Sequence, residues 1–378
     1  MALGFWLVAS AITPRGGDVQ ETLSSSNRIA IVLMLARTVI LNGTGYPLYS
    51  SLQFDYSRGM TGDAKAEGAG TLGPFPCNLM EFLDRFGTDE ACLEYLRALR
   101  WPDGFKCPAC GSGNGWVTAR GTIYCRVCAR QTSLTAGTIL HNSRTPVRKW
   151  FVGVWLLCTQ KTGVSAKTLQ RELKVGYKTA WLILQKLRGA MVRADRSLLS
   201  KMAEVDETYV GGEESGVAGR QLIGKSLVAI AVELDGKKVG RIRLRQVPDA
   251  SGKSLVGFIA DCVEQGARVH TDDWNGYNGV KAAGFVHRVT PILGDPERAV
   301  KFFPHVHLVA SLLKRWLGAT HQGGVQQQHL QGYLDEFAFR FNRRRSRHVG
   351  KIFHRLVEQL VVHKAKSYNE IVGNAKSD

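Results

Sequence analysis

Cys107-Pro-Ala-Cys110 and Cys125-Arg-Val-Cys128 are two paired-cysteine turns separated by residues 111–124. Each turn presents two sulfur atoms from one tight loop, and four thiolates converging on one point are a ligand set of structural, tetrahedral zinc. The intervening residues begin with a glycine-rich segment and continue with a run of Val, Thr, Ile and Tyr, as expected for short strands. The spacing therefore predicts a zinc ribbon with a closed, structural metal site.

A pair of disulfide bonds is the alternative explanation for these four cysteines. Nothing in the sequence resembles an export signal with a cleavage site, which would accompany disulfides in a secreted protein. The other cysteines have no evident partners in the sequence; they are Cys77, Cys92, Cys158 and Cys262. We therefore favour zinc.

The charge of the chain is strongly positive and unevenly distributed. Its 378 residues include 50 Lys and Arg against 32 Asp and Glu, which gives a net charge of +18. Residues 1–80 contain equal numbers of basic and acidic side chains, so the whole excess follows them. Such an excess attracts phosphate backbones. Composition favours a soluble, intracellular, nucleic acid-binding protein, and the length allows two or three domains.

Residues 1–79 differ from the rest of the chain. They are rich in Gly, Ser and Thr and contain one apolar stretch, residues 29–41, that Arg37 interrupts. The stretch is short for a helix that spans a bilayer, although a membrane anchor is the alternative. Organised patterning begins at Met80. We therefore expect residues 1–79 to be a leader or an over-extended reading frame, with Met80 as the native start.

Helical patterns precede and follow the predicted ribbon. Apolar residues between Glu81 and Arg100 predict two short helices, and Thr145-Pro146 begins another helix. Residues 163–188 then contain a short helix, a Val-Gly turn and a longer helix, the outline of a helix-turn-helix. An ordinary helical hairpin explains the same pattern. The ribbon and the positive charge lead us to favour DNA binding.

The next segment alternates strands and helices. The predicted elements are strands at residues 203–210, 227–234 and 239–247, a helix at 252–265, a strand at 267–272 and a candidate fifth strand at 287–290. This order is that of an RNase H-like core, in which the first and fourth strands lie side by side. Asp206 in the first strand and Asp272 at the end of the fourth would then be neighbours.

Two neighbouring carboxylates are costly unless cations neutralise them. Divalent metal ions held by such a pair can activate an attacking oxygen and stabilise a leaving oxygen in phosphodiester chemistry. The alternatives are a turn or edge-strand carboxylate for Asp206 and a loop cap for Asp272. The pattern by itself does not decide between them.

Four longer motifs resemble one family in order and register. They are Glu204-Val-Asp-Glu-Thr-Tyr-Val-Gly-Gly212, Thr271-Asp-Asp-Trp-Asn-Gly-Tyr277, Val309-Ala-Ser-Leu-Leu-Lys-Arg-Trp316 and Tyr333-Leu-Asp-Glu-Phe-Ala-Phe-Arg-Phe-Asn-Arg-Arg344. From about Met80 to Lys364 the chain resembles bacterial insertion-sequence DDE-type transposases of the zinc-ribbon-bearing, ISXO-like group. The resemblance implies a cut-and-join DNA recombinase with an RNase H-like domain and Mg²⁺ ions. It also implies that the ribbon and the helix-turn-helix recognise terminal repeats.

The resemblance also implies catalytic residues. Asp206 and Asp272 correspond to the first two carboxylates, with Asp273 as a less favoured substitute for the second. The third position of the family is a Glu or Asn seven residues before a Lys, and counting back from Lys314 gives His307.

The resemblance implies that His307 is a metal ligand and Lys314 a phosphate clamp. A neutral imidazole suits Mn²⁺ better than Mg²⁺, so His307 departs from the acidic triad. A solvated histidine pair, His305 and His307, at a helix start is the alternative.

Basic residues near the C-terminus accompany Phe337, Phe339 and Phe341. Arginine on the outside and phenylalanine on the inside can share one helix, so a solvated basic helix end and DNA binding are compatible. The predicted DNA-contacting residues are Lys178, Lys186, Arg188, Arg315, Arg343, Arg344, Arg345 and Arg347.

The expected architecture is multidomain α/β. Its segments are a leader (1–79), a zinc ribbon with preceding helices (80–142), a helix-turn-helix-like domain (143–200), an RNase H-like catalytic domain with mixed sheet and flanking helices (201–365), and a tail (366–378). The predicted function is a cytoplasmic, nucleoid-associated transposase. It would bind double-stranded terminal repeats and target DNA as a homo-oligomer, with structural Zn²⁺, catalytic Mg²⁺ or Mn²⁺ and no membrane. The alternatives are an inactive or domesticated DNA-binding protein and a nuclease without joining activity.

Overall fold

A computed structural model describes most of the chain after residue 73. The described residues are 74–193, 195–211, 224–236, 238–322, 324–364 and 366–373. The chain divides into two compact units, residues 1–65 and 66–378, and every described residue belongs to the second. The apolar stretch and almost all of the expected leader lie outside the described residues. In the described part of the chain, no helix has both the length and the apolar character needed to cross a membrane.

Two short helices lead into a small sheet, as the sequence predicts. Thr88 accepts a hydrogen bond from the amide of Ala91 and caps the second helix. The elements are α2 (Leu79–Arg85), α3 (Asp89–Arg100), β1 (Gly115–Val117), β2 (Ile123–Cys125) and β3 (Gln131–Thr132). The strands pair antiparallel in the order β1-β2-β3, so the two cysteine turns are carried by one three-stranded sheet.

Met80 lies inside α2 and not at its start. The side chain of Asn78 caps α2 by accepting a hydrogen bond of 3.0 Å from the amide of Glu81. Pro76 lies so close to Gly350 that a Cβ at Gly350 would collide with the Pro76 carbonyl oxygen. The residues just before Met80 therefore take part in the folded unit.

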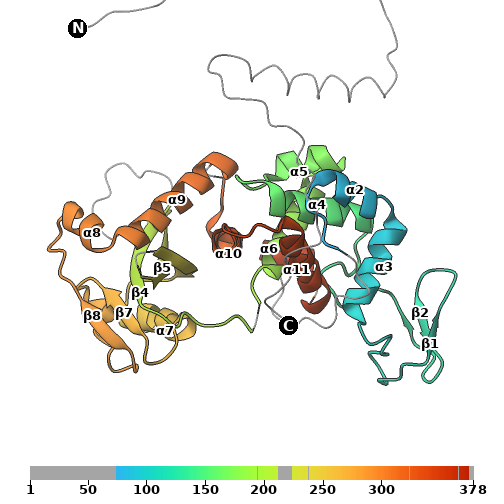
Figure 1. Ribbon diagram of the computed structural model, residues 1–378, viewed down its shortest axis with the longest axis horizontal. Coiled ribbons are helices and arrows are strands. Elements are labelled where there is room, and N and C mark those ends of the chain that lie inside the picture. The colour runs from blue at the N-terminus through green and yellow to red at the C-terminus, as the bar shows by residue number, and fades with distance from the viewer. Residues whose placement is uncertain are drawn as a thin grey trace, which may run out of the picture. The chain divides into compact units, whose positions relative to one another are not determined.

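The next helices form an aromatic core with α2 and α3. They are α4 (Val147–Thr159), α5 (Ala166–Leu173), α6 (Tyr177–Ala190) and, from the end of the chain, α11 (Val349–Val362). Phe82 of α2 stacks on Trp155 of α4 at 4.6 Å between ring centroids, and Phe353 of α11 packs edge-on against Phe82. Burial of such side chains contributes about 2–3 kcal/mol each. The last long helix therefore completes the core that the first helices begin, which Figure 1 lets the reader follow.

The short helix, turn and longer helix expected between residues 163 and 188 are α5 and α6. Ser165 caps α5 through the amide of Thr168, and Lys174 ends it in the left-handed conformation at φ 46°. Gly176 then begins α6. The secondary structure is as predicted, whereas contact of this pair with DNA stays a prediction.

A five-stranded mixed sheet follows, and it confirms the predicted strands. They are β4 (Ala203–Val210), β5 (Ser226–Asp235), β6 (Lys238–Val247), β7 (Arg268–Thr271) and β8 (Val286–Val289). The order is β6-β5-β4-β7-β8, with β4 antiparallel to β5, β5 antiparallel to β6, and β4, β7 and β8 mutually parallel. The first and fourth of these strands are thus adjacent, as expected.

Helices cover both faces of the sheet (Figure 1). The side chains of β5 alternate between two apolar clusters: Leu227 and Ala229 pack on the side of α7, and Val228 and Ile230 on the side of α9. The elements around the strands are α7 (Gly252–Cys262), η2 (Asn275–Tyr277), α8 (Pro296–Phe302), α9 (Pro304–His321), η3 (Gln327–His329), α10 (Leu330–Asn342) and α12 (Tyr368–Val372). A strand buried on both faces carries the near-continuous apolar run seen here.

A buried ion pair joins the helical core to the sheet's covering helices. Arg188 of α6 donates a hydrogen bond of 2.9 Å from Nε to Glu336 Oε2 of α10, and the two side chains are 1% and 0% exposed. The guanidinium of Arg188 also lies 3.8 Å from the ring centroid of Tyr333. Arg188 is therefore structural, and its predicted contact with DNA is wrong because the side chain does not reach the surface.

Replacing Glu336 with Gln is expected to destabilise the protein by about 3–5 kcal/mol, because Arg188 would stay buried without a counter-charge. Urea unfolding followed by circular dichroism measures the loss. Glu172→Gln is the control, since Glu172 pairs with Arg171 at the surface and exposed pairs contribute at most about 1 kcal/mol. Equal stability of the two variants would contradict a structural role for the buried pair.

Candidate active site

The four cysteines of the ribbon converge on one point. Their sulfur atoms all lie within 4.8 Å of one another, with Cys107 Sγ 3.5 Å from Cys128 Sγ and Cys110 Sγ 3.6 Å from Cys125 Sγ. A tetrahedron of sulfurs about 2.3 Å from zinc has edges of about 3.8 Å, whereas a disulfide bond measures about 2.05 Å. All eight cysteines are free. The ligand set therefore fits a structural zinc ion and excludes the disulfide alternative.

The two cysteine turns have the same backbone design. Gly111 donates its amide hydrogen to the carbonyl of Cys107, and Ala129 donates to the carbonyl of Cys125, and both donors adopt positive φ angles. The amide of Cys110 lowers the pKa of the Cys107 thiol, and the amide of Cys128 lowers the pKa of the Cys125 thiol. Both effects favour the thiolate, which is the form that binds metal.

The carboxylates of the second candidate site lie on neighbouring parallel strands. β4 and β7 pair with Ala203 opposite Val269 and Glu204 opposite His270. Extending this register by two residues places Asp206 beside Asp272, on strands about 4.8 Å apart. The observed strand order therefore agrees with the expectation that Asp206 and Asp272 are neighbours.

His307 of α9 approaches the same place. Its Nε2 lies 3.7 Å from Asp206 Oδ2. Burial lowers the pKa of His307, so the imidazole is neutral near pH 7 and keeps a lone pair for a cation. Lys314 follows seven residues later on α9, and burial lowers its pKa as well. Among the described residues, only the cysteine quartet forms a group of three or more His, Cys, Asp or Glu side chains placed to hold a metal ion.

Glu204 fixes the position of α9, and sequence reasoning missed it. Its side chain is buried, and Oε2 accepts hydrogen bonds from the amides of His305 (3.1 Å) and Val306 (3.2 Å). Glu204 Oε1 lies 2.7 Å from Nδ1 of His305. The residue before α9 supplies no side-chain cap, so a carboxylate from β4 caps this helix. The signal in the sequence was the spacing of two residues from Asp206, which places both on one face of β4.

Glu207 connects β4 to the segment after β7 through Tyr277. The Tyr277 hydroxyl donates a hydrogen bond of 2.7 Å to Glu207 Oε2. Burial raises the pKa of Tyr277, and Glu207, Asp206 and Asp272 raise it further. The hydroxyl is therefore neutral and donating, and three carboxylates lie close enough to act on one phenol.

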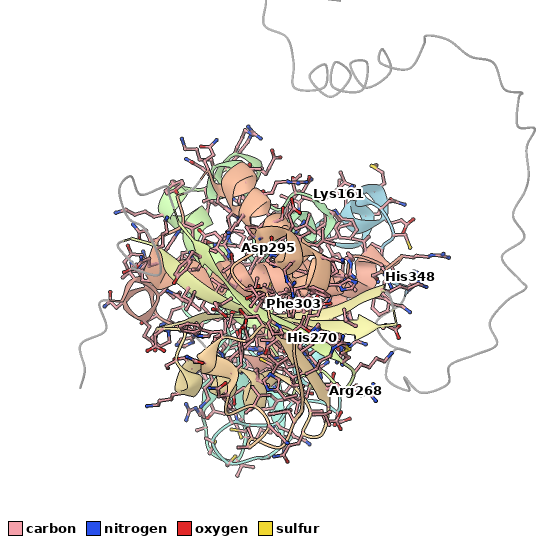
Figure 2. The ribbon with its side chains drawn as sticks, turned by 90° about the vertical axis from the view of Figure 1, so that its left-hand side faces the viewer. Lys161, Arg268, His270, Asp295, Phe303 and His348 are labelled. Atoms are coloured by element: carbon pink, nitrogen blue, oxygen red, sulfur yellow. The ribbon has the colours of Figure 1, made fainter. Side chains whose placement is uncertain are left out.

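The side chain of His270, in β7, packs against the start of α9. Its ring lies 4.5 Å from that of Phe303, the residue before α9, and its Nε2 is 2.8 Å from Thr290 Oγ1 (Figure 2). Asp295 caps α8 by accepting a hydrogen bond of 2.8 Å from the amide of Glu297. The contact of His270 with Phe303 therefore holds the start of α9 against β7.

Apart from Arg188, the residues predicted to contact DNA fall into two groups. The first group bonds to the protein itself: Lys186 donates to the carbonyl of Ile139, Arg343 lies over the ring of Phe339, and Arg344 over that of Phe341. Burial lowers the pKa of all three cations. Arg344 is nevertheless exposed, as are the remaining four residues, Lys178, Arg315, Arg345 and Arg347. This second group presents its charge to solvent.

Comparison with known proteins gives two family matches and one relative. Residues 198–342 match the family described as the ISXO2-like transposase domain, and residues 87–131 match the transposase zinc-ribbon domain. The chain is 26% identical over 275 residues to an uncharacterized protein in transposable element ISH50 of Halobacterium salinarum. That alignment covers 68% of this chain and 91% of the relative.

Proposed function

Because the chain contains an ISXO2-like transposase domain preceded by a transposase zinc-ribbon domain, we propose that it cleaves the ends of an insertion sequence and joins them to target DNA. The observation that supports this proposal is the approach of His307 Nε2 to within 3.7 Å of Asp206 Oδ2, on the strand that pairs with β7 just before Asp272. The order β6-β5-β4-β7-β8, with α7 between β6 and β7 along the chain, supports an RNase H-like core.

The proposed chemistry assigns a separate task to each side chain. Divalent cations held by Asp206 and Asp272 would supply the charge that activates the attacking oxygen and stabilises the leaving oxygen. His307 adds a neutral nitrogen ligand beside Asp206. Lys314 lies on the same helical face as His307 and would hold a phosphate near the reacting bond. Glu204 positions both by anchoring the start of α9 to β4.

The proposed partner is double-stranded DNA. The ribbon and the α5–α6 pair would recognise terminal repeats, and the exposed cations Lys178, Arg345 and Arg347 would contact phosphates. Because two ends of the element must meet during strand transfer, we propose that the protein forms a homo-oligomer on DNA. The proposed location is the cytoplasm, in association with the nucleoid. The zinc ion would stabilise the ribbon and take no part in the chemistry.

The direct test is a strand-transfer assay with the full chain. Purified protein is incubated with a labelled duplex carrying a terminal repeat, a plasmid target, and Mg²⁺ or Mn²⁺, and products are resolved on a denaturing gel. Cleavage at the repeat end followed by joining supports the proposal. Cleavage without joining would identify a nuclease, and repeat-specific binding without cleavage would identify a non-catalytic DNA-binding protein.

His307→Ala is expected to reduce strand transfer by more than about 100-fold, because loss of a metal ligand costs more than loss of a group behind it. His307→Glu and His307→Asn should retain more activity than His307→Ala. They should also shift metal preference from Mn²⁺ towards Mg²⁺, since oxygen is a harder donor than imidazole nitrogen. Strand transfer of a pre-cleaved duplex with each metal measures both effects.

The control for this series is His348→Ala, which removes an exposed histidine before α11. It should behave as the parent protein does. Parent-like activity in His307→Ala would move the third ligand elsewhere, with Asp295 or Glu297 next in line. Because the Asp295 side chain already caps α8, Glu297 would then be the better candidate for the third ligand.

A further inference from the structure

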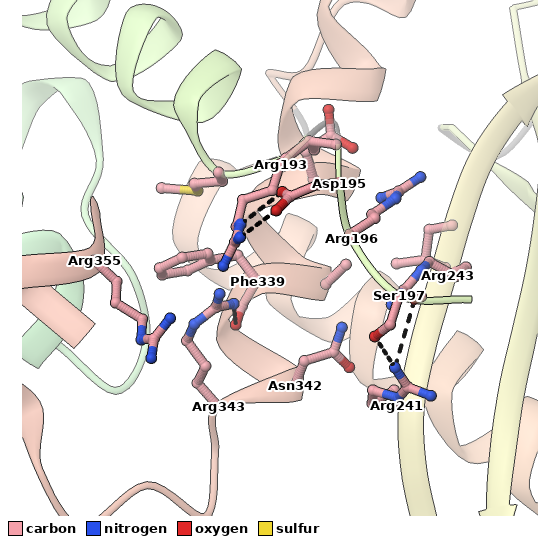
Figure 3. A pocket seen from close by; sticks show the side chains of 15 residues that line it. Arg193, Asp195, Arg196, Ser197, Arg241, Arg243, Phe339, Asn342, Arg343 and Arg355 are labelled. Carbon is pink, nitrogen blue, oxygen red and sulfur yellow. Dashed lines mark hydrogen bonds and ion pairs between the residues drawn. The ribbon is translucent and has the colours of Figure 1, made fainter. Parts of the chain in front are cut away.

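A pocket of about 490 Å³ lies where the helical core meets the sheet. Its walls are the connection between α6 and β4, strand β6, and the helices α10 and α11. Figure 3 shows arginine side chains around one space, from the connection, from β6, from α11 and from Arg343, which directly follows α10. β6 is an edge strand, two positions away from β4 in the sheet, so the pocket is separate from the carboxylate site.

Arginine dominates the lining of the pocket. Six arginines face two aspartates there, and the arginines are Arg193, Arg196, Arg241, Arg243, Arg343 and Arg355. Arg193 pairs with Asp195 through two hydrogen bonds of 2.9 and 2.5 Å, and Arg241 pairs with Glu233 at 2.7 Å. Within the described residues, the other four arginines form no ion pair. The pocket therefore carries an excess of positive charge.

The arginines of the pocket lie close enough to lower one another's pKa values. Burial lowers the pKa of Arg243 to about 10, with Arg196 contributing next, and Arg243 donates hydrogen bonds to the backbone carbonyls of Ile242 and Ser197. Burial likewise lowers the pKa of Arg343, and Arg355 lowers it further. Gathering cations in this way is unfavourable, and an anion placed among them would offset the cost.

We infer that this pocket binds a phosphate group, and that the DNA backbone supplies it. The planar guanidinium group matches phosphate oxygens through paired hydrogen bonds, which makes arginine the usual residue for this ligand. The identification of DNA as the source rests on the proposed function. Strand spacing puts β6 about 10 Å from β4, so the phosphate held here is not the one that reacts at Asp206. The pocket would anchor a flanking stretch of the duplex.

The test is the double variant Arg196→Gln/Arg355→Gln, because both side chains are exposed and neither supports the core. Duplex binding is measured by fluorescence anisotropy at several KCl concentrations. We expect about tenfold weaker binding, and a log–log salt slope shallower by about 0.9 for each phosphate that the variant no longer neutralises. The matched control is Arg268→Gln/Lys281→Gln, which removes the same charge from exposed positions at the start of β7 and after η2.

A second measurement distinguishes the source of the phosphate. Thermal unfolding is followed with and without inorganic phosphate, and the parent protein should be stabilised where the Arg196→Gln/Arg355→Gln variant is not. A decrease in DNA affinity beyond that of the control assigns the site to the DNA backbone. If the variant loses the stabilisation by phosphate but binds DNA as tightly as the control does, the site binds a free phosphate-bearing molecule instead.

An Arg196→Gln/Arg355→Gln variant that matches the control in DNA binding, salt slope and response to phosphate would overturn the inference. This result can be told apart from failure of the proposed function. Cleavage by the parent protein tests the carboxylate site without any change to the arginine pocket.

Discussion

Asp206→Asn and Asp272→Asn are each expected to reduce strand cleavage and strand transfer by about 1,000-fold or more while leaving DNA binding nearly unchanged. Asparagine keeps the volume of the side chain but removes the charge that holds a divalent cation. Removing one of two neighbouring carboxylates also relieves repulsion, so the thermal unfolding midpoint should stay the same or rise.

The measurement for these variants combines gel-based cleavage with an anisotropy titration of the same duplex. Asp273→Asn is the control, since Asp273 is the exposed neighbour that could substitute for Asp272. Full activity in Asp206→Asn, or in both Asp272→Asn and Asp273→Asn, would overturn the two-metal interpretation. An inactive Asp273→Asn beside an active Asp272→Asn would instead exchange the roles of these two residues.

Cys110→Ser is expected to remove zinc from the protein and to unfold the ribbon. Zinc binding contributes on the order of 10–16 kcal/mol to the folding of small zinc domains, and a serine hydroxyl is a poor substitute for a thiolate. The ribbon contains only short strands, and apart from its cysteines few of its side chains are buried, so little else stabilises it. Metal analysis of purified protein should show one zinc ion per parent chain and none in the variant.

The control for the zinc prediction is Cys77→Ser, which changes an exposed cysteine outside the quartet. It should retain one zinc ion per chain. The mixed sheet of the Cys110→Ser protein should keep its protection from hydrogen exchange, because its apolar clusters do not include the ribbon. Full zinc content in Cys110→Ser would refute the assignment of the four ligands.

Local patterns in the sequence predict much of this fold. The spacing of Cys107, Cys110, Cys125 and Cys128 predicts the ribbon, because each turn fixes two sulfurs within a few residues. Alternating apolar runs predict the strands, and their order predicts that β4 and β7 are neighbours. The approach of His307 to Asp206 also follows the predicted arrangement.

Interactions between residues far apart in sequence are what the patterns miss. Arg188 reads as a surface cation on a helix, but a partner 148 positions later, Glu336, makes burial tolerable. Glu204 reads as one more strand carboxylate, and its role depends on a helix that begins a hundred residues further on. The arginine pocket gathers side chains from several elements, and no single stretch of sequence reveals it.

The core shared by α2, α4 and α11 determines when a newly made chain can finish folding. The ribosome adds α11 only after the whole sheet segment has been translated, so the apolar faces of α3 and α4 stay uncovered until late in synthesis. Such distant pairings also form slowly, because a long loop must close first. A chain that ends before α11 therefore lacks a complete helical core.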